Sequence, residues 1–228
     1  MTDENGRIDL EPIAYIHTDF PEKFGIPRQS ELIRELRGTI VFRPAYNKPG
    51  ILKGLEQFTH LWLLWGFSEN QATWQPTVRP PRLGGNIRLG VFATRSPYRP
   101  NPIGLSAVRI EALETNNVIH VRGVDMVDKT PIYDIKPYLP YSDAVFDAGG
   151  GFADKPPCKK NVVFSNTITI PAPMRDMLIR LLELDPRPAY QNDPERIYGM
   201  RYADCHVHFR VCQNTVYVIA VERETPSR

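Results

Sequence analysis

Cysteine and long hydrophobic runs are scarce in this sequence, and each shortage excludes a class of protein. The 228 residues include only three cysteines, Cys158, Cys205 and Cys212. An odd and sparse count argues against a disulfide framework and favours a reducing compartment. The N-terminal stretch is polar and has no apolar signal region, and no later run reaches the length of a membrane span. We therefore expect a cytoplasmic protein that has no membrane partner.

Acidic charge is missing from one long stretch, between Glu69 and Glu111. The basic residues within this stretch are all arginine and never lysine: Arg79, Arg82, Arg88, Arg95, Arg99 and Arg109. Such a local positive field suits a carboxylate or a polyanion, and arginine is the better bidentate donor. The alternative is a solvated basic face with acids supplied from elsewhere in the fold. The net charge of +2 does not by itself demand a nucleic-acid partner.

The composition is otherwise that of an ordinary core-forming protein. Hydrophobic residues make up 42% and charged residues 24% of the chain. The 22 prolines are roughly twice the average share and are spread along the sequence, which favours rigid loops over disorder. The length allows one large domain, or a main domain with a small appendage.

Short extended segments dominate the region between Leu10 and Asp143. Strands are expected at 10–18, 38–44, 58–67, 86–94 and 104–114, with a short helical turn near 31–36. Many short strands and little helix predict a mainly β fold, either a barrel or a sandwich-like sheet, over residues 1–145.

The composition changes after Tyr141. Residues 146–160 are rich in glycine, proline and charge and are typical of a linker. Beyond it, "VVFSNTITI" alternates as a strand does, and Met174 to Leu182 have apolar residues at helical spacing before Pro186. "CHVHFRVCQNTVYVIAVE" predicts a hairpin that turns near residues 213–215. Residues 161–228 are therefore expected to form a small α+β domain.

"RSPYRPNPIG", from Arg95 to Gly104, is the first candidate site. Each of its three prolines fixes its own φ angle and restricts the residue before it. A loop ordered in advance lowers the entropy cost of binding for Arg95, Arg99 and Asn101. The alternative is a rigid barrel corner with solvent-facing arginines. A rigid corner would explain the prolines. It would not explain why the arginines Arg95 and Arg99 lie beside the hydroxyl of Ser96 and the side-chain amide of Asn101.

"DMVDKTPIYDIKPYLPY" is the second dense stretch, and it begins with Asp125 and Asp128. Asp134 and Lys136 fall on one side of an extended segment, where an ordinary surface ion pair between them is worth ~0–1 kcal/mol. The functional interpretation is an acidic wall that faces the arginine-rich loop.

Two further motifs each allow two interpretations. In "CHVHFRVC", His206, His208 and Cys212 share one face of a strand, but this spacing gives no compact tetrahedral set without another ligand, so no metal is expected. "DPRPAY" is either a turn that stops a helix or an RNA contact. In the second case, Arg187 would bind the backbone and Tyr190 would stack on a base.

The motifs "RSPYRPNPIGLS" and "DMVDKTPIYDIKPYLPY" together resemble the signature pair of the TrmO family, also called TsaA-like or YaeB-like. "EKFGIPRQS", "GLEQFTHLWLLWGF", "RPPRLGGNIRLGVFATRS" and "DPRPAY" are similar as well, so the resemblance covers nearly the whole chain. It implies an S-adenosylmethionine-dependent tRNA methyltransferase that methylates N6 of threonylcarbamoyladenosine beside the anticodon. It also implies a single-sheeted β-barrel instead of a Rossmann fold. The sequence agrees, since "RLGGNIRLG" lacks the spacing and context of a dinucleotide-binding fingerprint.

The resemblance also implies site residues, a homodimer, and a cofactor cleft that draws on both protomers. His60 would otherwise be interpreted as a core histidine. The catalytic candidates are Asp128 and Asp125, either of which could take the proton as general base, and Arg99, which could pair with the threonylcarbamoyl carboxylate. The contacts expected with tRNA are Arg99, Asn101, Arg187 and Tyr190. The cofactor contacts fall on Pro27, Arg28, Gln29, His60, Leu61, Arg95, Leu105, Asp125, Met126, Val127, Asp128, Lys129 and Thr130.

A different class of function is also compatible with these motifs. A non-catalytic β-barrel that binds RNA or a nucleotide would keep the same arginine-rich loop. Such a protein would bind the cofactor or the RNA without forming a methylated product, which is the observation that separates the two classes.

Overall fold

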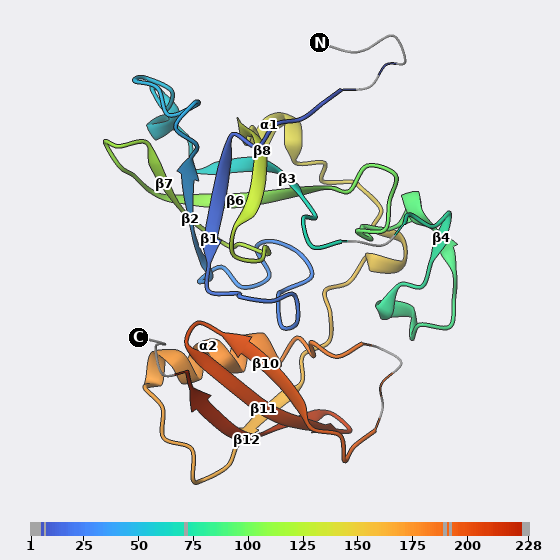
Figure 1. Cartoon of the computed structure of the whole chain (residues 1–228). Coiled ribbons are helices and arrows are strands. Elements are labelled where there is room, and N and C mark those ends of the chain that lie inside the picture. The colour runs from blue at the N-terminus through green and yellow to red at the C-terminus, as the bar shows by residue number, and fades with distance from the viewer. Residues whose placement is uncertain (1–5, 7, 71–72, 189–190, 192, 225–228) are drawn as a thin grey trace.

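The computed structural model describes residues 6, 8–70, 73–188, 191 and 193–224, which form a barrel and a smaller C-terminal unit (Figure 1). The barrel is closed, and its strands follow the order β1-β2-β7-β6-β3-β8. Every neighbouring pair is antiparallel, and β8 closes the barrel by pairing with both β1 and β3. The strands are β1 (Ala14–Thr18), β2 (Arg37–Phe42), β3 (His60–Gly66), β6 (Ile103–Leu113), β7 (Val118–Arg122) and β8 (Thr130–Pro137).

Alternation of apolar and polar residues explains why these segments form a barrel. Successive side chains of a strand point to opposite faces, so one residue in two enters the core. In β2 the pattern buries Gly38, Ile40 and Phe42, and in β3 it buries Leu61 and Leu63. The mainly β fold expected from the sequence is confirmed.

An extension leaves the barrel between β3 and β6 and carries the short hairpin of β4 (Thr77–Val78) and β5 (Leu89–Gly90). A three-residue 3₁₀ helix lies between these two strands at Pro81–Leu83, a second follows β5 at Val91–Ala93, and another precedes β3 at Leu55–Gln57. The strand expected over 86–94 is confirmed only at Leu89–Gly90 and is wrong on both sides of it. Its chain turns because the Thr94 amide bonds to the carbonyl of Val91 at 3.1 Å.

The helical turn expected over 31–36 is also wrong, since the chain forms bends and turns there. Glu31 has a φ of 64°, and this left-handed conformation cannot belong to a right-handed helix. Its amide bonds to the carbonyl of Gly123 at 3.0 Å, while the Gly123 amide bonds to Leu36 at 2.8 Å. One local bond of 3.3 Å, from the Leu36 amide to the Ile33 carbonyl, closes a single turn, and the tertiary bonds to the segment after β7 fix the remainder.

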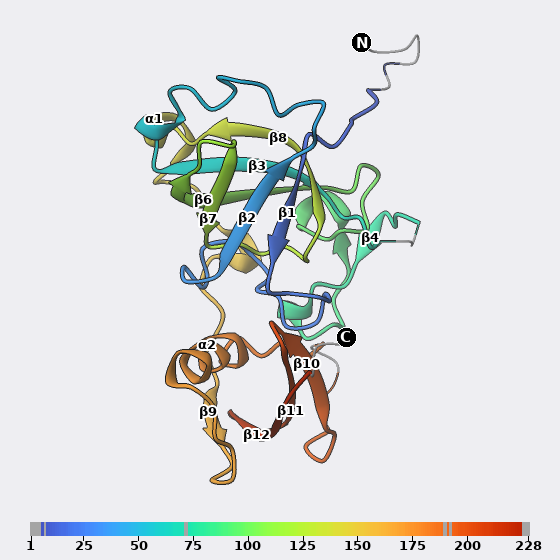
Figure 2. The same cartoon turned by 60° about the vertical axis from the view of Figure 1, so that its left-hand side comes forward.

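The C-terminal unit is a four-stranded sheet of order β10-β11-β12-β9 with helix α2 against one face (Figure 2). Its hairpin and helix lie where the sequence predicts them, although the strand at 198–202 is not predicted. Short helical segments at α1 (Pro140–Asp143) and Gly151–Ala153 precede this unit. Its elements are β9 (Asn161–Phe164), α2 (Ala172–Leu182), β10 (Tyr198–Tyr202), β11 (Cys205–Cys212) and β12 (Thr215–Arg223).

The loop after β1 joins the barrel to the C-terminal unit. Phe20 packs on Tyr202 with ring centroids 5.2 Å apart, and Phe24 stacks on Phe209 at 6.3 Å. The backbone adds a hydrogen bond of 2.7 Å from the Ala203 amide to the Asp19 carbonyl. One continuous apolar core results, so the C-terminal sheet and the barrel hold each other in place. Among the described residues, no helix is long and apolar enough to cross a membrane.

Candidate functional site

The arginine loop, Arg95–Gly104, joins the extension to β6 and is braced by its own hydrogen bonds. The Ser96 amide bonds to Thr94 Oγ1 at 3.3 Å, and the Tyr98 amide bonds to Ser96 Oγ at 3.2 Å. Asn70 donates its side-chain amide to the Pro97 carbonyl at 2.9 Å. These contacts and the three prolines limit the loop to few conformations.

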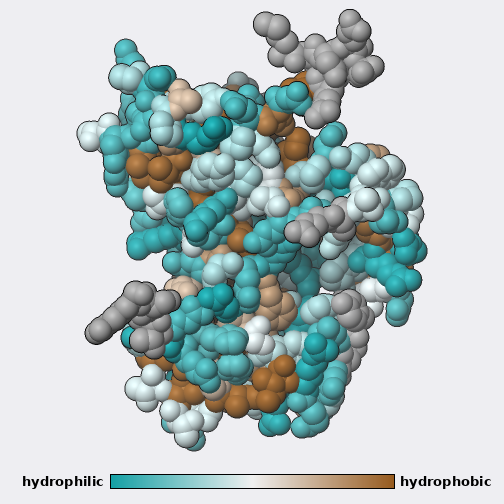
Figure 3. Space-filling view, in the orientation of Figure 1, coloured by the Kyte–Doolittle hydropathy of each residue, from teal (hydrophilic) through white to brown (hydrophobic). Residues whose placement is uncertain are grey.

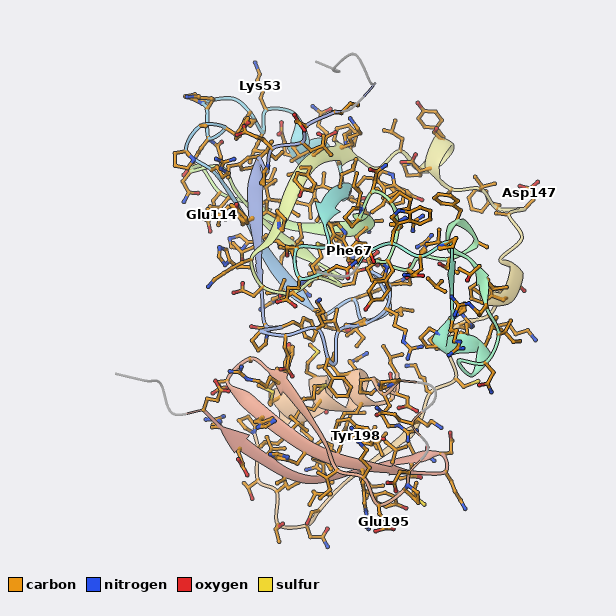
Figure 4. The ribbon with its side chains drawn as sticks, turned by 45° about the vertical axis from the view of Figure 1, so that its right-hand side comes forward. Lys53, Phe67, Glu114, Asp147, Glu195 and Tyr198 are labelled. Carbon is orange, nitrogen blue, oxygen red and sulfur yellow. The ribbon has the colours of Figure 1, made fainter. Side chains whose placement is uncertain are left out.

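Gly104 ends the loop, and its role is to make room for an aromatic ring. A Cβ added there would lie 2.2 Å from the Trp65 ring, so only glycine fits beside the indole. Trp65 also packs against Phe67 with ring centroids 4.4 Å apart, and Phe67 lies where the extension leaves the barrel (Figure 4). The position of the Trp65 indole thus depends on Gly104.

A polar chain runs from Trp65 to Asp125 at this end of the barrel. Trp65 Nε1 donates to Ser106 Oγ at 3.0 Å, and Ser106 Oγ donates to Asp125 Oδ1 at 2.7 Å. Burial of the carboxylate raises the pKa of Asp125 from 3.8 to about 6, and the Ser106 hydrogen bond opposes that rise. Asp125 is therefore an ionised but comparatively basic carboxylate at neutral pH.

Arg95 lies close to this carboxylate and connects it to the loop that contains "GIPRQ". The Arg95 guanidinium donates to Gln29 Oε1, and its positive charge lowers the pKa of Asp125. Arg28 donates to the carbonyl of Arg187 at 3.2 Å, and burial lowers the pKa of its guanidinium. Three predicted cofactor residues from distant parts of the sequence, Gln29, Arg95 and Asp125, are thus brought together.

Asp128 lies three residues after Asp125 but has different hydrogen-bond partners. Its Oδ1 accepts from the Thr18 amide at 3.2 Å and lies 3.1 Å from His17 Nδ1, at the end of β1. Lys129 has a φ of 62° where the chain turns into β8, and Thr130 donates its hydroxyl to the Val127 carbonyl at 2.8 Å. The segment therefore presents Asp125 and Asp128 to different surroundings.

Several predicted cofactor residues have side chains inside the barrel. Leu61 is 0% exposed, Met126 1% and Thr130 3%, so a ligand on the surface would reach them through backbone atoms. Leu105 differs, since it is 56% exposed on β6. Pro27 is buried, and Val127 is half-buried beside Asp128.

His60 lies at the start of β3, remote from the Trp65 end of that strand. Its Nδ1 is 2.9 Å from Thr59 Oγ1, and its ring lies edge-on to Tyr138 with centroids 6.3 Å apart. Five residue steps along a strand amount to about 16 Å between His60 and Trp65. The predicted cofactor residues therefore form separate groups within one chain.

Of the residues predicted to contact RNA, two lie on the arginine loop. Arg99 donates to the carbonyls of Thr94 at 3.3 Å and Ser96 at 3.5 Å through the same Nη1 atom. A guanidinium has five N–H donors, and within the described part of the chain the other donors of Arg99 have no hydrogen-bond partner and can serve a ligand. Asn101 is exposed two residues further along.

Arg187 is buried, being 8% exposed, and its guanidinium donates hydrogen bonds of 2.8 and 2.9 Å to the two carboxylate oxygens of Asp185. Burial alone would raise the pKa of Asp185, but the Arg187 bonds and charge hold it below its ordinary value. The Arg187 side chain therefore makes its hydrogen bonds within the turn that follows α2. The backbone carbonyl of Arg187 accepts a hydrogen bond from Arg28. Tyr190 lies outside the described residues.

Ser106 and Trp65 belong to this site, and the sequence analysis missed both. The signal was present, because β6 buries Gly104, Ser106 and Val108 in alternation. A serine in a run of core positions needs a hydrogen-bond partner, and here the partners are Asp125 and Trp65.

The donor set fits a ligand with the chemistry of a sulfonium amino acid and a nucleoside. Guanidinium groups such as Arg95 bind carboxylates, and a carboxylate such as Asp125 suits a nearby cation or hydroxyl group. The braced loop and the exposed Leu105 add a rigid edge and an apolar surface. The site therefore has groups for each end of such a molecule.

Comparison with known proteins gives one consistent picture. Residues 15–144 match the family described as the tRNA-methyltransferase O N-terminal domain, and residues 162–224 match the TrmO C-terminal domain. A Pseudomonas aeruginosa protein with the name of an S-adenosylmethionine-dependent methyltransferase is 45% identical over 211 residues, covering 88% of this chain and 91% of its own. The tRNA (adenine(37)-N6)-methyltransferase of Escherichia coli is 38% identical over 228 residues, covering 93% and 97%.

A solved structure supports the same relationship. The crystal structure of TrmO from P. aeruginosa superposes with a TM-score of 0.77 at 37% sequence identity. The superposition covers 95% of this chain and 97% of that one, so both the barrel and the C-terminal unit are shared.

Proposed function

We propose a specific tRNA reaction for this chain, which belongs to the tRNA-methyltransferase O family through both its barrel and its C-terminal unit. It is an S-adenosylmethionine-dependent methyltransferase that acts on N6 of an adenine in tRNA. The finer proposal is that the acceptor is adenosine 37 already carrying a threonylcarbamoyl group, so that the product is its N6-methyl derivative. The carboxylate of that group suits the unused donors of Arg99.

The cofactor is proposed to bind between the "GIPRQ" loop, the arginine loop and the segment 125–130. When bound, it supplies an electrophilic methyl group on a sulfonium. Arg95 would hold its carboxylate, while Gln29 orients the Arg95 guanidinium. The remaining contacts proposed are backbone or side-chain contacts of Pro27, Arg28, His60, Leu61, Leu105, Met126, Val127, Asp128, Lys129 and Thr130.

The observation that carries the mechanism is the half-buried Asp125, whose carboxylate is desolvated and is held by Ser106 near Arg95. The N6 nitrogen must lose a proton when it gains the methyl group. A general base works best when its pKa lies near the operating pH, and burial brings Asp125 closer to that range than an ordinary aspartate. Asp125 is therefore the proposed base. Asp128, which is paired with His17, would position the cofactor instead.

The active form is proposed to be a homodimer whose cleft uses both protomers. Support comes from the separation of His60 from the Arg95–Asp125 group within one chain. The exposed Leu105 and the neighbouring Ile103, 37% exposed, offer an apolar surface beside the arginine loop. The anticodon loop would enter along Arg99 and Asn101, while Arg187 shapes the turn after α2.

The proposed location is the cytoplasm, where the tRNA substrate is found. Cys158, Cys205 and Cys212 are free thiols, as expected in a reducing compartment. We propose that the chain is divided into two domains and a linker: a barrel over 1–145, a linker over 146–160 and an α+β domain over 161–228.

Mass spectrometry of tRNA nucleosides from a strain that lacks this protein tests the proposal. We expect the N6-methylated threonylcarbamoyladenosine to disappear and its unmethylated precursor to accumulate. Return of the product with a plasmid copy would attribute the change to this protein. An unchanged nucleoside profile, together with cofactor binding by the purified protein, would favour a non-catalytic binding protein instead.

A further inference from the structure

The open face of the C-terminal sheet carries two histidines and a glutamate that the methyl transfer does not use. His206 and His208 alternate on β11 and so share a face, and Glu222 lies opposite His206 on β12. One ligand atom from each of the three lies within 4.8 Å of the other two. We propose that this set, the His-Glu cluster, binds a divalent transition-metal ion, with zinc as the preferred ion.

The geometry of the three side chains is close to that of a metal site. The imidazole rings of His206 and His208 have centroids 4.3 Å apart, and His208 Nε2 lies 3.9 Å from Glu222 Oε1. Tetrahedral zinc holds nitrogen and oxygen ligands at about 2.0–2.1 Å, which places neighbouring ligand atoms about 3.3 Å apart. Small side-chain rotations close the difference. Glu222 is free to make them because its side chain is 69% exposed.

Small residues on both neighbouring strands leave space for these side chains. Gly199 on β10 and Ala220 on β12 are the two residues paired with His208. A Cβ added at Gly199 would lie 2.7 Å from His206 Nε2, so the imidazole occupies the room that glycine leaves. A register shift between His208 and Phe209 lets Ala220, and not Ile219, stand opposite His208.

The neighbouring cations are directed to other partners. Arg201 on β10, which is paired with His206 on β11, bonds to Glu224 at 2.5 Å. Arg210, two residues beyond His208, lies over the Tyr217 ring at 5.6 Å and 3.9 Å from Glu195. Glu222 is therefore the carboxylate left to the two histidines.

The third ligand comes from a neighbouring strand, which the sequence could not show. Cys212, which shares the face of His206 and His208, lies four residues beyond His208, or about 13 Å along the strand. The pairing of β11 with β12 supplies Glu222 instead. Two imidazoles and one carboxylate form a known type of zinc site that leaves a position open for water. The ion would fasten β11 to β12 on the face that α2 does not cover.

Calorimetric titration of tag-free, chelator-treated protein with zinc sulfate tests this proposal. Wild type should bind one ion per chain. His206→Ala and His208→Ala should each weaken the affinity at least about tenfold, and Glu222→Gln by a similar factor. Zinc should raise the melting temperature of wild type but not that of the double variant His206→Ala/His208→Ala.

Two matched variants separate the His-Glu cluster from nearby alternatives. Glu224→Gln removes a neighbouring carboxylate that pairs with Arg201, and it should bind zinc as wild type does. Cys212→Ser should do so too, and the cobalt-substituted protein should lack an intense thiolate band. Circular dichroism without metal should show that every variant is folded.

Three results would overturn the assignment. The first is that folded wild type takes up no zinc. The second is that the double variant keeps wild-type affinity. The third is that Cys212→Ser loses the ion. In the first case, Glu222 and His208 form an ordinary surface ion pair.

Discussion

Ser106 donates a hydrogen bond of 2.7 Å to Asp125 and thereby fixes a carboxylate that burial has made unusually basic. The serine is itself held by the Trp65 indole, so the orientation of Asp125 depends on the packing of the barrel. Arg95 opposes the effect of burial by its charge. This balance leaves an ionised base at neutral pH, next to the loop that is proposed to bind the cofactor.

Asp125 is predicted to lower the stability of the fold at the pH where it serves as a base. Its pKa is about 6 in the native state against an ordinary value of 3.8, so the native state holds the proton to a higher pH than the unfolded chain. This group's contribution to stability is therefore lost as pH rises from about 4 to 6. Asp125→Asn should be more stable than wild type at pH ~8 by roughly 1–3 kcal/mol, measured by urea unfolding.

A matched control for this prediction is Asp134→Asn, because Asp134 is an exposed carboxylate paired with Lys136. It should show no such gain, since a surface ion pair is worth ~0–1 kcal/mol. Equal stability of wild type and Asp125→Asn at both pH ~5 and pH ~8 would show that the Asp125 carboxylate is not desolvated.

The pH dependence of methyl transfer should show an acidic limb near the pKa of Asp125, about 6. Activity should fall below this pH because the protonated carboxyl cannot accept a proton. The hydrogen bond from Ser106 lowers the pKa of Asp125, so Ser106→Ala should move the limb to higher pH. Initial rates across the pH range, at saturating cofactor, provide the measurement. An acidic limb at the same pH in Ser106→Ala and wild type would show that the group whose titration limits activity is not hydrogen-bonded to Ser106.

Arg99 is predicted to recognise the carboxylate of the modified adenosine. Arg99→Ala should lower kcat/KM for threonylcarbamoylated tRNA by about 10-fold or more, as loss of a charge-assisted hydrogen bond does. Arg88→Ala serves as the control, because Arg88 binds Thr77 within the extension. Parallel assays with tRNA that lacks the threonylcarbamoyl group give the ratio of kcat/KM for the two tRNAs, which measures the preference for the modified adenosine. An unchanged preference between the two tRNAs would rule out this role.

A shared cleft makes a prediction about mixed dimers. Arg95→Ala and His60→Ala should each be nearly inactive as homodimers. If the two residues act from different protomers, a heterodimer of the two variants contains one site in which both are intact. Unfolding and refolding the variants together should then restore up to about a quarter of the wild-type rate, as random assembly dictates. Activity no higher than the sum of the separate variants would place both residues in the same protomer.

The sequence predicted the fold class because alternation and proline content depend on local chemistry. The barrel strands and α2 follow from apolar periodicity that each segment carries by itself. The bends at 31–36 were not predictable in this way, since the bonds of Glu31 and Leu36 to Gly123 join segments about 90 residues apart. The proline-braced loop was visible as a candidate site, but its link to Asp125 depends on the closure of the barrel.

The roles of individual residues were less predictable than the motifs that contain them. Asp125 and Asp128 look equivalent in the sequence, and only the fold gives one of them Ser106 and the other His17. Glu222 likewise has no visible relation to His206 until β11 and β12 pair.

The central claim is that Asp125 removes the proton from N6 of the acceptor adenosine, and one assay tests it most directly. Asp125→Asn and wild type are compared at pH ~8 with threonylcarbamoylated tRNA, while cofactor binding is measured by calorimetry on the same samples. We predict that the variant still binds the cofactor but forms methylated nucleoside at least about 100-fold more slowly. A variant that binds the cofactor and methylates tRNA at the wild-type rate would contradict the assignment of the base.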